Sequence, residues 1–275
     1  FGKNRHRATR IASIAAAAVA AVFAWQTFGL GLRWYVSGHA PWSNAYETMV
    51  YVGWATVLSG LVFARRSRLA PALAALMGGV VLFVSNLNWL DPQITPLVPV
   101  LKSYWLMIHV SVVTASYGFF GICAACGIAS LAATAFGRNL RELRAINEMA
   151  MIVGLALLTA GIFFGAVWAN ESWGRYWGWD PKETWALITM FAYALATHSR
   201  HIPRLDGPFA FDVLSVVCFS TVLMTFFGVN YYLSGLHSYG HSGGVSLTVP
   251  LIGASVVIAL IGAAAGRYFK TSKKR

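Results

Sequence analysis

The sequence contains few charged residues and very few acidic ones. Only 11% of its 275 residues are charged, and nine are Asp or Glu. Soluble domains carry about 25% charged residues, so this chain lacks the polar surface that such a domain needs. Hydrophobic residues make up 57% of it, against roughly 45–50% in soluble domains, which is more than one globular core can bury. A membrane is therefore the expected solvent.

Cysteine is also scarce, with three residues in the chain. Cys123 and Cys126 have the spacing of redox and haem-attachment motifs. A haem-attachment motif continues with histidine, whereas the next residue here is Gly127. The pair lies in an apolar run, where thiols usually act as packing residues, and Cys218 lies in another. We therefore expect structural cysteines, no covalent haem on this chain and no disulfide framework.

Apolar runs close to the ~20 residues that span a bilayer recur along the chain. They predict an all-α fold, a polytopic membrane bundle of about eight transmembrane helices that forms one membrane domain over residues 1–275. The expected spans are 11–32, 45–64, 69–87, 106–136, 149–168, 184–197, 209–229 and 245–265. The first run is too long and too weakly terminated for a cleaved signal peptide, so a true span is expected there. A start at Phe1 is compatible with a longer or processed polypeptide.

The basic residues are sorted by side of the membrane. With both termini cytoplasmic, the inner segments hold 17 of the 21 Lys and Arg residues. The outer segments hold the other four, which are Arg33, Lys102, Arg175 and Lys182. This is the positive-inside bias of a protein with an even number of spans, and it supports the short sixth span. The net charge of +12 thus reports topology, and nucleic-acid binding is not expected.

A cluster of tryptophans lies between the fifth and sixth expected spans, on the outer side. The loop 168–185 contains five of the chain's eleven, which are Trp168, Trp173, Trp177, Trp179 and Trp185. Interfacial anchoring is the simpler explanation, but it does not require this density. Gly174 and Gly178 allow tight turns beside broad indole faces, so the loop suits a planar macrocycle.

The end of this loop has the pattern of a helix start. Asp180 is a good N-cap, Pro181 suits the first helical position, and Glu183 completes a capping box. These local rules explain all three residues without a ligand, so a structural role for Asp180 stands beside a binding role. Arg175 and Lys182 are the cations of the loop, and haem propionates are the obvious partners for them.

A haem that is not covalently attached needs iron ligands, usually neutral imidazole. Of the chain's seven histidines, His109 and His237 fall at the outer side with the tryptophan loop. They are expected to bind iron from opposite faces of one ring. The alternative for His109 is a packed helix face shared with Val113, Tyr117 and Phe120.

His198 belongs to a different region, roughly 27 Å along its helix from Asp180, towards the cytoplasm. It is either a ligand of a second haem position within the membrane or a cap of the helix C-terminus, and position alone does not separate the two. The remaining histidines are at the surface or in outer loops: His6, His39, His201 and His241. His241 is an alternative ligand to His237.

The stretch 173–185 reads Trp-Gly-Arg-Tyr-Trp-Gly-Trp-Asp-Pro-Lys-Glu-Thr-Trp and closely resembles the WWD signature of the haem-handling protein family. The stretches 40–47, 180–189 and 228–239 resemble the CcsA/ResC branch, which works in System II cytochrome c biogenesis. The CcmC and CcmF branches work in System I. The resemblance covers residues 41–239, with Tyr176 standing where some members have tryptophan.

The resemblance implies a multi-pass protein of the bacterial inner membrane with its WWD loop on the periplasmic side. It implies transport of haem b outward and its attachment to an apocytochrome c carrying Cys-X-X-Cys-His, a haem lyase activity exerted together with CcsB/ResB, separate or fused. His109 and His237 match the family's external ligands, and His198 matches its histidine within the membrane. The implied haem contacts in the loop are Trp173, Arg175, Trp177, Trp179 and Asp180.

Catalysis would then be positioning. One of His109 and His237 would yield to the substrate histidine, and the tryptophans would fix the ring, while no residue resembles a dedicated general base. One alternative is CcmC-like haem delivery without thioether synthesis, which predicts about six spans and no Lys-Glu-Thr-Trp continuation. The other is a transporter that binds no haem and uses its tryptophans as interfacial anchors.

Overall fold

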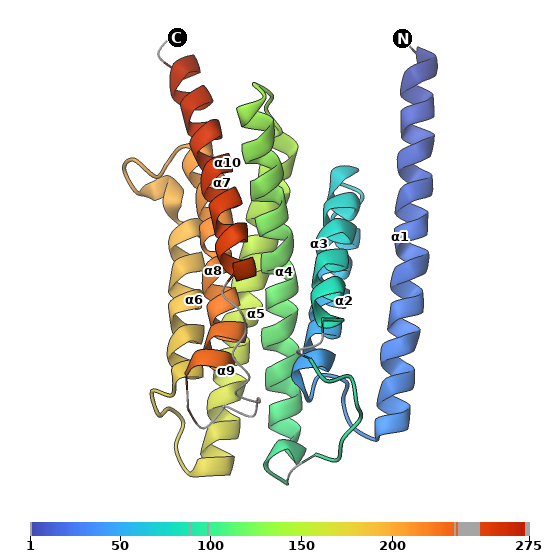
Figure 1. Ribbon diagram of the computed structural model, residues 1–275, viewed down its shortest axis with the longest axis vertical. Coiled ribbons are helices and arrows are strands. Elements are labelled where there is room, and N and C mark those ends of the chain that lie inside the picture. Colours follow the sequence, from blue (N-terminus) through green and yellow to red (C-terminus); the bar gives the residue numbers. More distant parts are fainter. Residues whose placement is uncertain (1, 88–89, 98, 234, 236–247, 273–275) are drawn as a thin grey trace. The chain divides into compact units, whose positions relative to one another are not determined.

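The computed structural model describes residues 2–87, 90–97, 99–233, 235 and 248–272 (Figure 1). All regular structure in these ranges is helical, which confirms the predicted all-α class. The elements are α1 (Gly2–Ser37), α2 (Ala45–Val62), α3 (Leu69–Ser85), η1 (Pro99–Lys102), α4 (Tyr104–Ala135), α5 (Arg141–Trp173), α6 (Pro181–Thr197), η2 (Ser199–His201), α7 (Pro208–Val217), α8 (Phe219–Leu223), η3 (Met224–Gly228), α9 (Val229–Tyr232) and α10 (Thr248–Ser272).

Five segments of the described chain are long and apolar enough to cross a membrane. They are Thr9–Ser37, Tyr104–Ala135, Arg141–Trp173, Pro208–Tyr232 and Leu251–Thr271. They confirm a polytopic helical bundle and coincide with the first, fourth, fifth, seventh and eighth predicted spans. Helices α2, α3 and α6 coincide with the other three but have only 18, 17 and 17 residues. A helix of 17 residues is about 26 Å long, slightly under the ~30 Å of a hydrocarbon core, so these three remain predicted spans.

The seventh span is a nearly continuous helix with one irregular turn. Helices α7, α8 and α9 follow one another over Pro208–Tyr232, and the turn η3 between α8 and α9 is π-helical. Such a turn widens the helix locally and often marks a functional position. It lies directly before Val229 and Asn230, at the start of the stretch 228–239 singled out in the sequence.

The chain forms two compact units. The first unit consists of Phe1–Ile122 and Ala156–Trp177, and the second of Cys123–Leu155 and Gly178–Arg275. Helices α4 and α5 therefore contribute to both units, and the tryptophan loop is divided between Trp177 and Gly178. The single membrane domain over residues 1–275 remains a prediction.

In the first unit, small residues let helices approach closely. A Cβ atom on Gly118 of α4 would lie 2.7 Å from the Cβ of Ala55 on α2, and one on Gly60 of α2 would collide with Ala74 of α3. Membrane helices commonly associate through such small residues, because lipid tails provide no hydrophobic drive between helices. The glycines thus explain why three consecutive apolar helices pack together.

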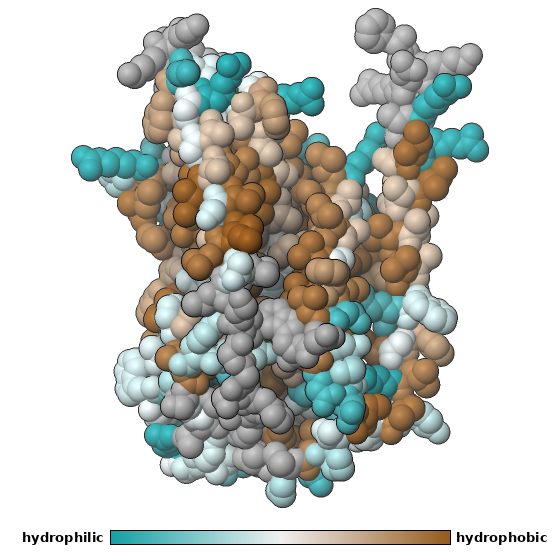
Figure 2. Space-filling view, viewed as in Figure 1, coloured by the Kyte–Doolittle hydropathy of each residue, from teal (hydrophilic) through white to brown (hydrophobic). Residues whose placement is uncertain are grey.

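Helix α1 packs on α2 through one seam of aromatic rings. Adjacent centroids along this seam are 4.9–5.5 Å apart, and its members are Phe23, Trp54, Tyr51, Trp42 and Trp34. The apolar window of α1 is otherwise unburied, and its exposed surface includes Trp25 and Phe28. Figure 2 shows the surface along this helix as largely hydrophobic. Such a surface suits contact with lipid.

The second unit encloses polar pairs within apolar helices. Arg144 of α5 donates bidentate hydrogen bonds to the buried Asp212 of α7, with Nη2 2.8 Å from Oδ2. One turn further along both helices, the Asn147 amide donates to the Ser215 hydroxyl at 2.8 Å. Asp212 and Ser215 also pack against Gly127 of α4. Buried ionic groups need such partners, because an unpaired charge away from water is very costly.

The three cysteines are buried and free, and all lie in this unit. The Cys123 thiol donates to the Asn147 carbonyl at 3.5 Å, and the Cys218 thiol to the Ala192 carbonyl at 3.4 Å. Both contacts are those of packing residues. The buried Thr189 and Thr225 hydroxyls, 3.0 Å apart, join α6 to the π-helical turn.

Candidate functional site

His109 lies in the first unit, on α4, with its ring against α5. Its Nδ1 is 2.7 Å from the carbonyl oxygen of Gly161. A Cβ atom on Gly165, one turn further along α5, would lie 2.5 Å from Cε1 and 2.6 Å from Nδ1 of the same ring. Gly161 is equally tight, since a Cβ there would lie 2.5 Å from Val113. Two glycines one turn apart thus form a seat for the imidazole.

This seat orients the ring for a second interaction. A carbonyl oxygen can only accept, so the short contact assigns the Nδ1 proton of the neutral ring to the bond with Gly161. Nε2 is then the nitrogen with a lone pair that a metal can use. Histidines that ligate metals usually donate their other N–H to a carbonyl or carboxylate in this way. The predicted packing of His109 against its neighbours and its predicted role as a ligand are therefore compatible.

The part of the tryptophan loop in the first unit is mostly packed. Trp168 is fully buried and meets Trp173 edge to face, with centroids 4.7 Å apart. Gly174 follows the end of α5 in the left-handed region, with φ of 70°, as the predicted tight turn requires. Arg175 is exposed and Trp177 half-buried. Trp168 thus belongs to the core, while Arg175 beyond Gly174 is exposed.

The part of the loop in the second unit is a capped helix start. The Asp180 carboxylate accepts the Lys182 N–H at 3.1 Å, and the Glu183 carboxylate accepts the Asp180 N–H at 3.1 Å. Both halves of the capping box are present, as the sequence predicts. Glu183 also accepts the Gly178 N–H at 2.8 Å. One carboxylate oxygen therefore holds the amides on both sides of Trp179.

Trp179 has an unusual conformation that the sequence does not predict. Its φ is 57°, and the residue is 69% exposed. The sequence assigned the tight turns to Gly174 and Gly178, whereas the left-handed residues are Gly174 and Trp179. A left-handed backbone costs a residue with a Cβ atom roughly 1–2 kcal/mol, and the two bonds to Glu183 offset that cost. The effect is to present an indole on the surface immediately before α6.

Lys182 and Asn230 join this helix start to the end of the seventh span. The Lys182 ammonium donates to the Asn230 side-chain oxygen at 2.8 Å. Burial lowers the pKa of Lys182 to about 8, partly opposed by the negative charge of Asp180. The chain then returns to the same place, because a Cβ on Gly235 would lie 2.9 Å from Cδ of Pro181. Lys182, predicted to meet a ligand carboxylate, thus has a protein partner.

His237 and His241 lie outside the described residues. His237 follows Gly235 by two positions in the sequence, and Gly235 packs against Asp180 and Pro181. The two stretches that carry much of the family resemblance, 180–189 and 228–239, are therefore brought together within the second unit as far as Gly235. The role of His237 as a ligand stays a prediction.

His198 ends α6 and is exposed. Its Nδ1 is 2.8 Å from the carbonyl oxygen of Ala194 and 3.1 Å from the Thr197 hydroxyl. This is the geometry of the capping alternative, in which the ring satisfies a carbonyl at the helix end. A second haem position at His198 stays a prediction.

The described residues include no group of three or more His, Cys, Asp or Glu side chains that could hold a metal ion. A haem brings four nitrogen ligands of its own, so it needs only one or two imidazoles from the protein. The oriented ring of His109 fits that requirement. A bare metal ion would not find a full set of ligands among these residues.

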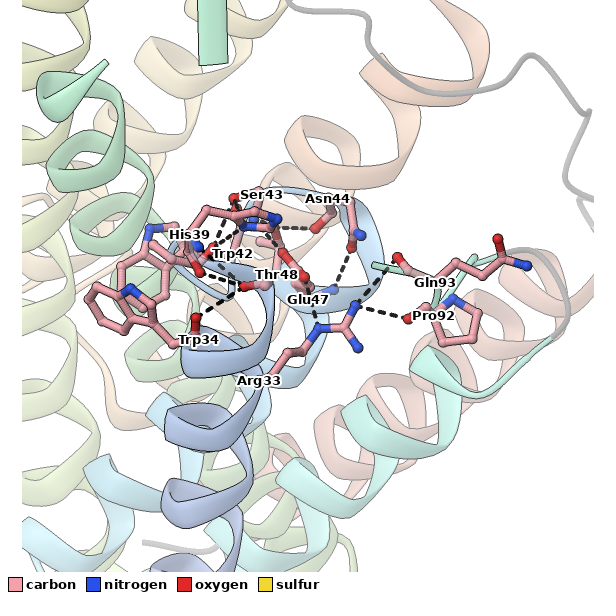
Figure 3. A network of polar contacts seen from close by, with 12 residues as sticks. Arg33, Trp34, His39, Trp42, Ser43, Asn44, Glu47, Thr48, Pro92 and Gln93 are labelled. Atoms are coloured by element: carbon pink, nitrogen blue, oxygen red, sulfur yellow. Dashed lines mark hydrogen bonds and ion pairs between the residues drawn. The ribbon is translucent and has the colours of Figure 1, made fainter. Parts of the chain in front are cut away.

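A polar network around Glu47 was not anticipated from the sequence (Figure 3). The network joins α1, the turn before α2 and the segment around Gln93, and the Trp42 indole of the same turn donates to the Met107 carbonyl on α4. In the sequence, the stretch 40–47 is distinguished only by its resemblance to the CcsA branch. The contacts that Arg33 and Trp42 make are long-range, so no local pattern predicts them.

The fold and the site define a polytopic helical membrane protein with a tryptophan-rich loop, in which Trp179 is exposed, and an imidazole oriented by a neighbouring helix. Residues 42–237 match the cytochrome C assembly protein family. The chain belongs to this family, and its relatives place it with the CcsA-type proteins of cytochrome c biogenesis.

Three relatives illustrate the similarity. Protein NrfI of Wolinella succinogenes is 51% identical over 226 residues, which cover 79% of this chain and 25% of that protein. The cytochrome c biogenesis protein CcsA of Guillardia theta is 36% identical over 246 residues, covering 78% of this chain and 81% of that protein. CcsA of Parasynechococcus marenigrum is 36% identical over 253 residues, covering 78% and 82%. The chain thus spans a quarter of NrfI and most of the CcsA proteins.

Proposed function

We propose that this chain is the haem-handling part of a cytochrome c synthetase, which moves haem b to the outer face of the membrane and attaches it to apocytochrome c. The observation that carries the proposal is the ring of His109, oriented by the Gly161 carbonyl so that Nε2 is the nitrogen suited to iron. Family membership and the exposed Trp179 support the same function.

In the proposed site, His109 and His237 are the axial ligands of haem iron. Trp173, Trp177 and Trp179 bound the ring as apolar faces, and the exposed Arg175 binds a propionate. Asp180 acts indirectly, because its carboxylate fixes the helix start that follows Trp179. Haem itself supplies the vinyl groups that become thioethers.

The chain's contribution to catalysis is positioning. A ring held by ligands and indoles presents its vinyl edge in one orientation, which replaces a bimolecular encounter by an oriented one. One of His109 and His237 gives way to the histidine of the substrate motif Cys-X-X-Cys-His. We propose no dedicated general base in this chain, and the thiols are activated by the substrate or by the partner.

Several finer features belong to the same proposal. The partner is a CcsB/ResB-type protein, separate or fused, and membrane lipid surrounds the bundle. The chain resides in the bacterial inner membrane with both termini in the cytoplasm and the WWD loop in the periplasm. The bias of the basic residues supports this orientation. His198 serves a second haem position nearer the cytoplasm, supported by the resemblance alone.

Covalent attachment distinguishes this proposal from CcmC-like delivery. The chain is expressed with a CcsB/ResB-type partner and an apocytochrome c carrying Cys-X-X-Cys-His, and haem bound through thioethers is detected after denaturation. We expect attachment that requires the chain, the partner and both cysteines of the substrate. Haem in the purified complex without any attachment would favour delivery, and no haem at all would favour a transporter.

A further inference from the structure

The turn before α2 is built around a buried ion pair. The Glu47 side chain is fully buried, and its Oε1 lies 2.8 Å from Nε of Arg33, whose side chain is one-fifth exposed. Burying two charges costs desolvation energy that a single contact seldom repays. Ionisable groups buried in a membrane protein are for this reason candidates for a functional role.

The second oxygen of the carboxylate fixes the turn itself (Figure 3). Glu47 Oε2 accepts the backbone N–H of Ser43 at 2.8 Å, while the Asn44 side chain accepts the Glu47 N–H at 2.8 Å. Nη2 of Arg33 donates to the Pro92 carbonyl at 2.9 Å. The ion pair thus connects α1, the turn 40–44 and the segment around Pro92.

The turn carries the indole of Trp42 to α4. Its Nε1 donates to the Met107 carbonyl at 3.2 Å, and its ring packs against Tyr51 and Trp34, with centroids 4.9 and 5.3 Å away. Met107 precedes His109 by two residues on the same helix. Within the first unit, α4 is therefore held at Met107 by Trp42 and at His109 by the glycine seat of α5.

We propose that Glu47 is a positioning residue for His109, which acts through Trp42. The carboxylate and Arg33 hold the turn 40–44, the turn holds the indole against Met107, and that contact fixes the helical turn that carries His109. The inference rests on the proposed function where it concerns haem. It rests on the contacts alone where it concerns the placement of α4.

If the ion pair only stabilised the first unit, its loss would have a different effect from the one proposed. Loss of such a pair would lower the stability of the first unit without a specific effect on α4, and Trp42 would be unrelated to it. If Glu47 acts through Trp42, the two substitutions have the same local effect and do not add, because each removes the same link. Non-additivity at α4 therefore separates the two explanations.

The test compares four variants of the full chain, purified with its partner: Glu47→Ala, Glu47→Gln, Trp42→Phe and the double variant Glu47→Ala/Trp42→Phe. Glu47→Gln keeps an acceptor for the Ser43 N–H. Trp42→Phe removes the donor to Met107 and keeps an aromatic ring, although a smaller one, against Tyr51 and Trp34. Ser59→Ala is the matched control, because Ser59 is fully buried in α2 and, within the described part of the chain, its hydroxyl bonds only to the Thr56 carbonyl of its own helix.

Two measurements are made on each variant. Hydrogen exchange by mass spectrometry follows the peptide 104–112, and transfer of haem to apomyoglobin follows haem release. We expect Trp42→Phe and Glu47→Ala to increase the rate of exchange and the rate of haem release by about fivefold, which corresponds to the loss of one hydrogen bond. The double variant should equal Glu47→Ala, Glu47→Gln should fall between Glu47→Ala and wild type, and Ser59→Ala should leave both unchanged.

Unchanged exchange of 104–112 in both Trp42→Phe and Glu47→Ala would overturn the inference, as would additive effects in the double variant. Faster exchange with unaltered haem release would also overturn it, because α4 would then be placed without consequence for haem. If Glu47→Ala is not recovered from membranes, Trp42→Phe decides by the same criteria. A wild type without haem would overturn the proposed function, while exchange would still show whether Glu47 acts on α4.

Discussion

The two histidines that the structure describes at proposed haem positions are held in different ways. His109 is half-buried, and its bond runs to Gly161 on another helix, 52 residues away. His198 is exposed, and its bond runs to Ala194 of its own helix, four residues away. The orientation of the His109 ring depends on the space that the glycines of α5 leave for it. The His198 ring needs only the last turn of its own helix. The proposed external ligand therefore depends on packing, and the inner one on local geometry.

The largest effect is expected when the space beside the His109 ring is filled. Gly165→Ala places a methyl group within 2.5 Å of the ring, so the ring must move away from the Gly161 carbonyl. We expect a loss of about 1–3 kcal/mol of stability from overpacking and a loss of haem from the external site. Haem content and the absorption spectrum of the purified protein measure the effect.

Gly79→Ala provides the control for this substitution. Gly79 lies in α3, and a Cβ there would meet nothing within 4 Å. Alanine is the better helix former, so this variant should bind haem like the wild type with equal or slightly higher stability. Normal haem binding in Gly165→Ala would show that the seat does not matter for ligation.

A second prediction concerns local contacts, at the start of α6. Glu183→Ala removes the acceptor of the Gly178 and Asp180 amides and frees Trp179 from its left-handed conformation. We expect a loss of about 1 kcal/mol, typical of a helix cap, and weaker haem binding. Glu183→Gln retains an acceptor and should recover most of the stability and most of the haem binding. Oxidative footprinting of Trp179 reports its exposure directly. An unchanged pattern in Glu183→Ala would show that the two hydrogen bonds to Glu183 do not hold Trp179 in place.

The charge of Lys182 makes the same region sensitive to pH. Its pKa of about 8 lies below the ordinary 10.5, so the unfolded chain binds more protons than the folded chain between these values. Stability of the second unit should therefore rise as pH increases from 7 to 9, by about 1 kcal/mol. Thermal unfolding at several pH values measures this, and Lys182→Met should remove the dependence.

The smallest effect is expected at His198. His198→Ala removes one contact to the helix end, worth about 0.3–1 kcal/mol. If His198 also serves a second haem position, the variant lowers total haem while the ligands of the external site stay intact. Haem quantification with the absorption spectrum of the remaining haem tests this, and unchanged loading would leave the capping role alone.

Local patterns in the sequence predicted the parts of the fold that depend on neighbouring residues. The apolar runs located eight helices, and Asp180 with Glu183 located the start of α6. Hydrophobic periods and capping act over a few residues, so a single sequence contains them. The spacing of the tryptophans likewise identified the loop, although not the packing of Trp168 inside the core.

Long-range contacts could not be predicted in this way. The seat of His109 depends on Gly161 and Gly165, whose GxxxG spacing indicates a close helix contact without specifying that His109 of α4 occupies it. The bond from Trp42 to Met107 joins residues 65 positions apart. The conformation of Trp179 contradicts its own residue preference, because tertiary and capping contacts override it. Such exceptions to local rules tend to occur at functional positions.

The most direct measurement of the central claim is the absorption spectrum of the purified protein, expressed with its partner. We compare wild type, His109→Ala, His237→Ala and the surface control His201→Ala. The account predicts a haem spectrum with two imidazole ligands in wild type and in His201→Ala. This spectrum should be lost or altered in His109→Ala and in His237→Ala. Adding imidazole to these two variants should restore it. A colourless wild type, or His109→Ala and His237→Ala spectra identical to wild type, would contradict it.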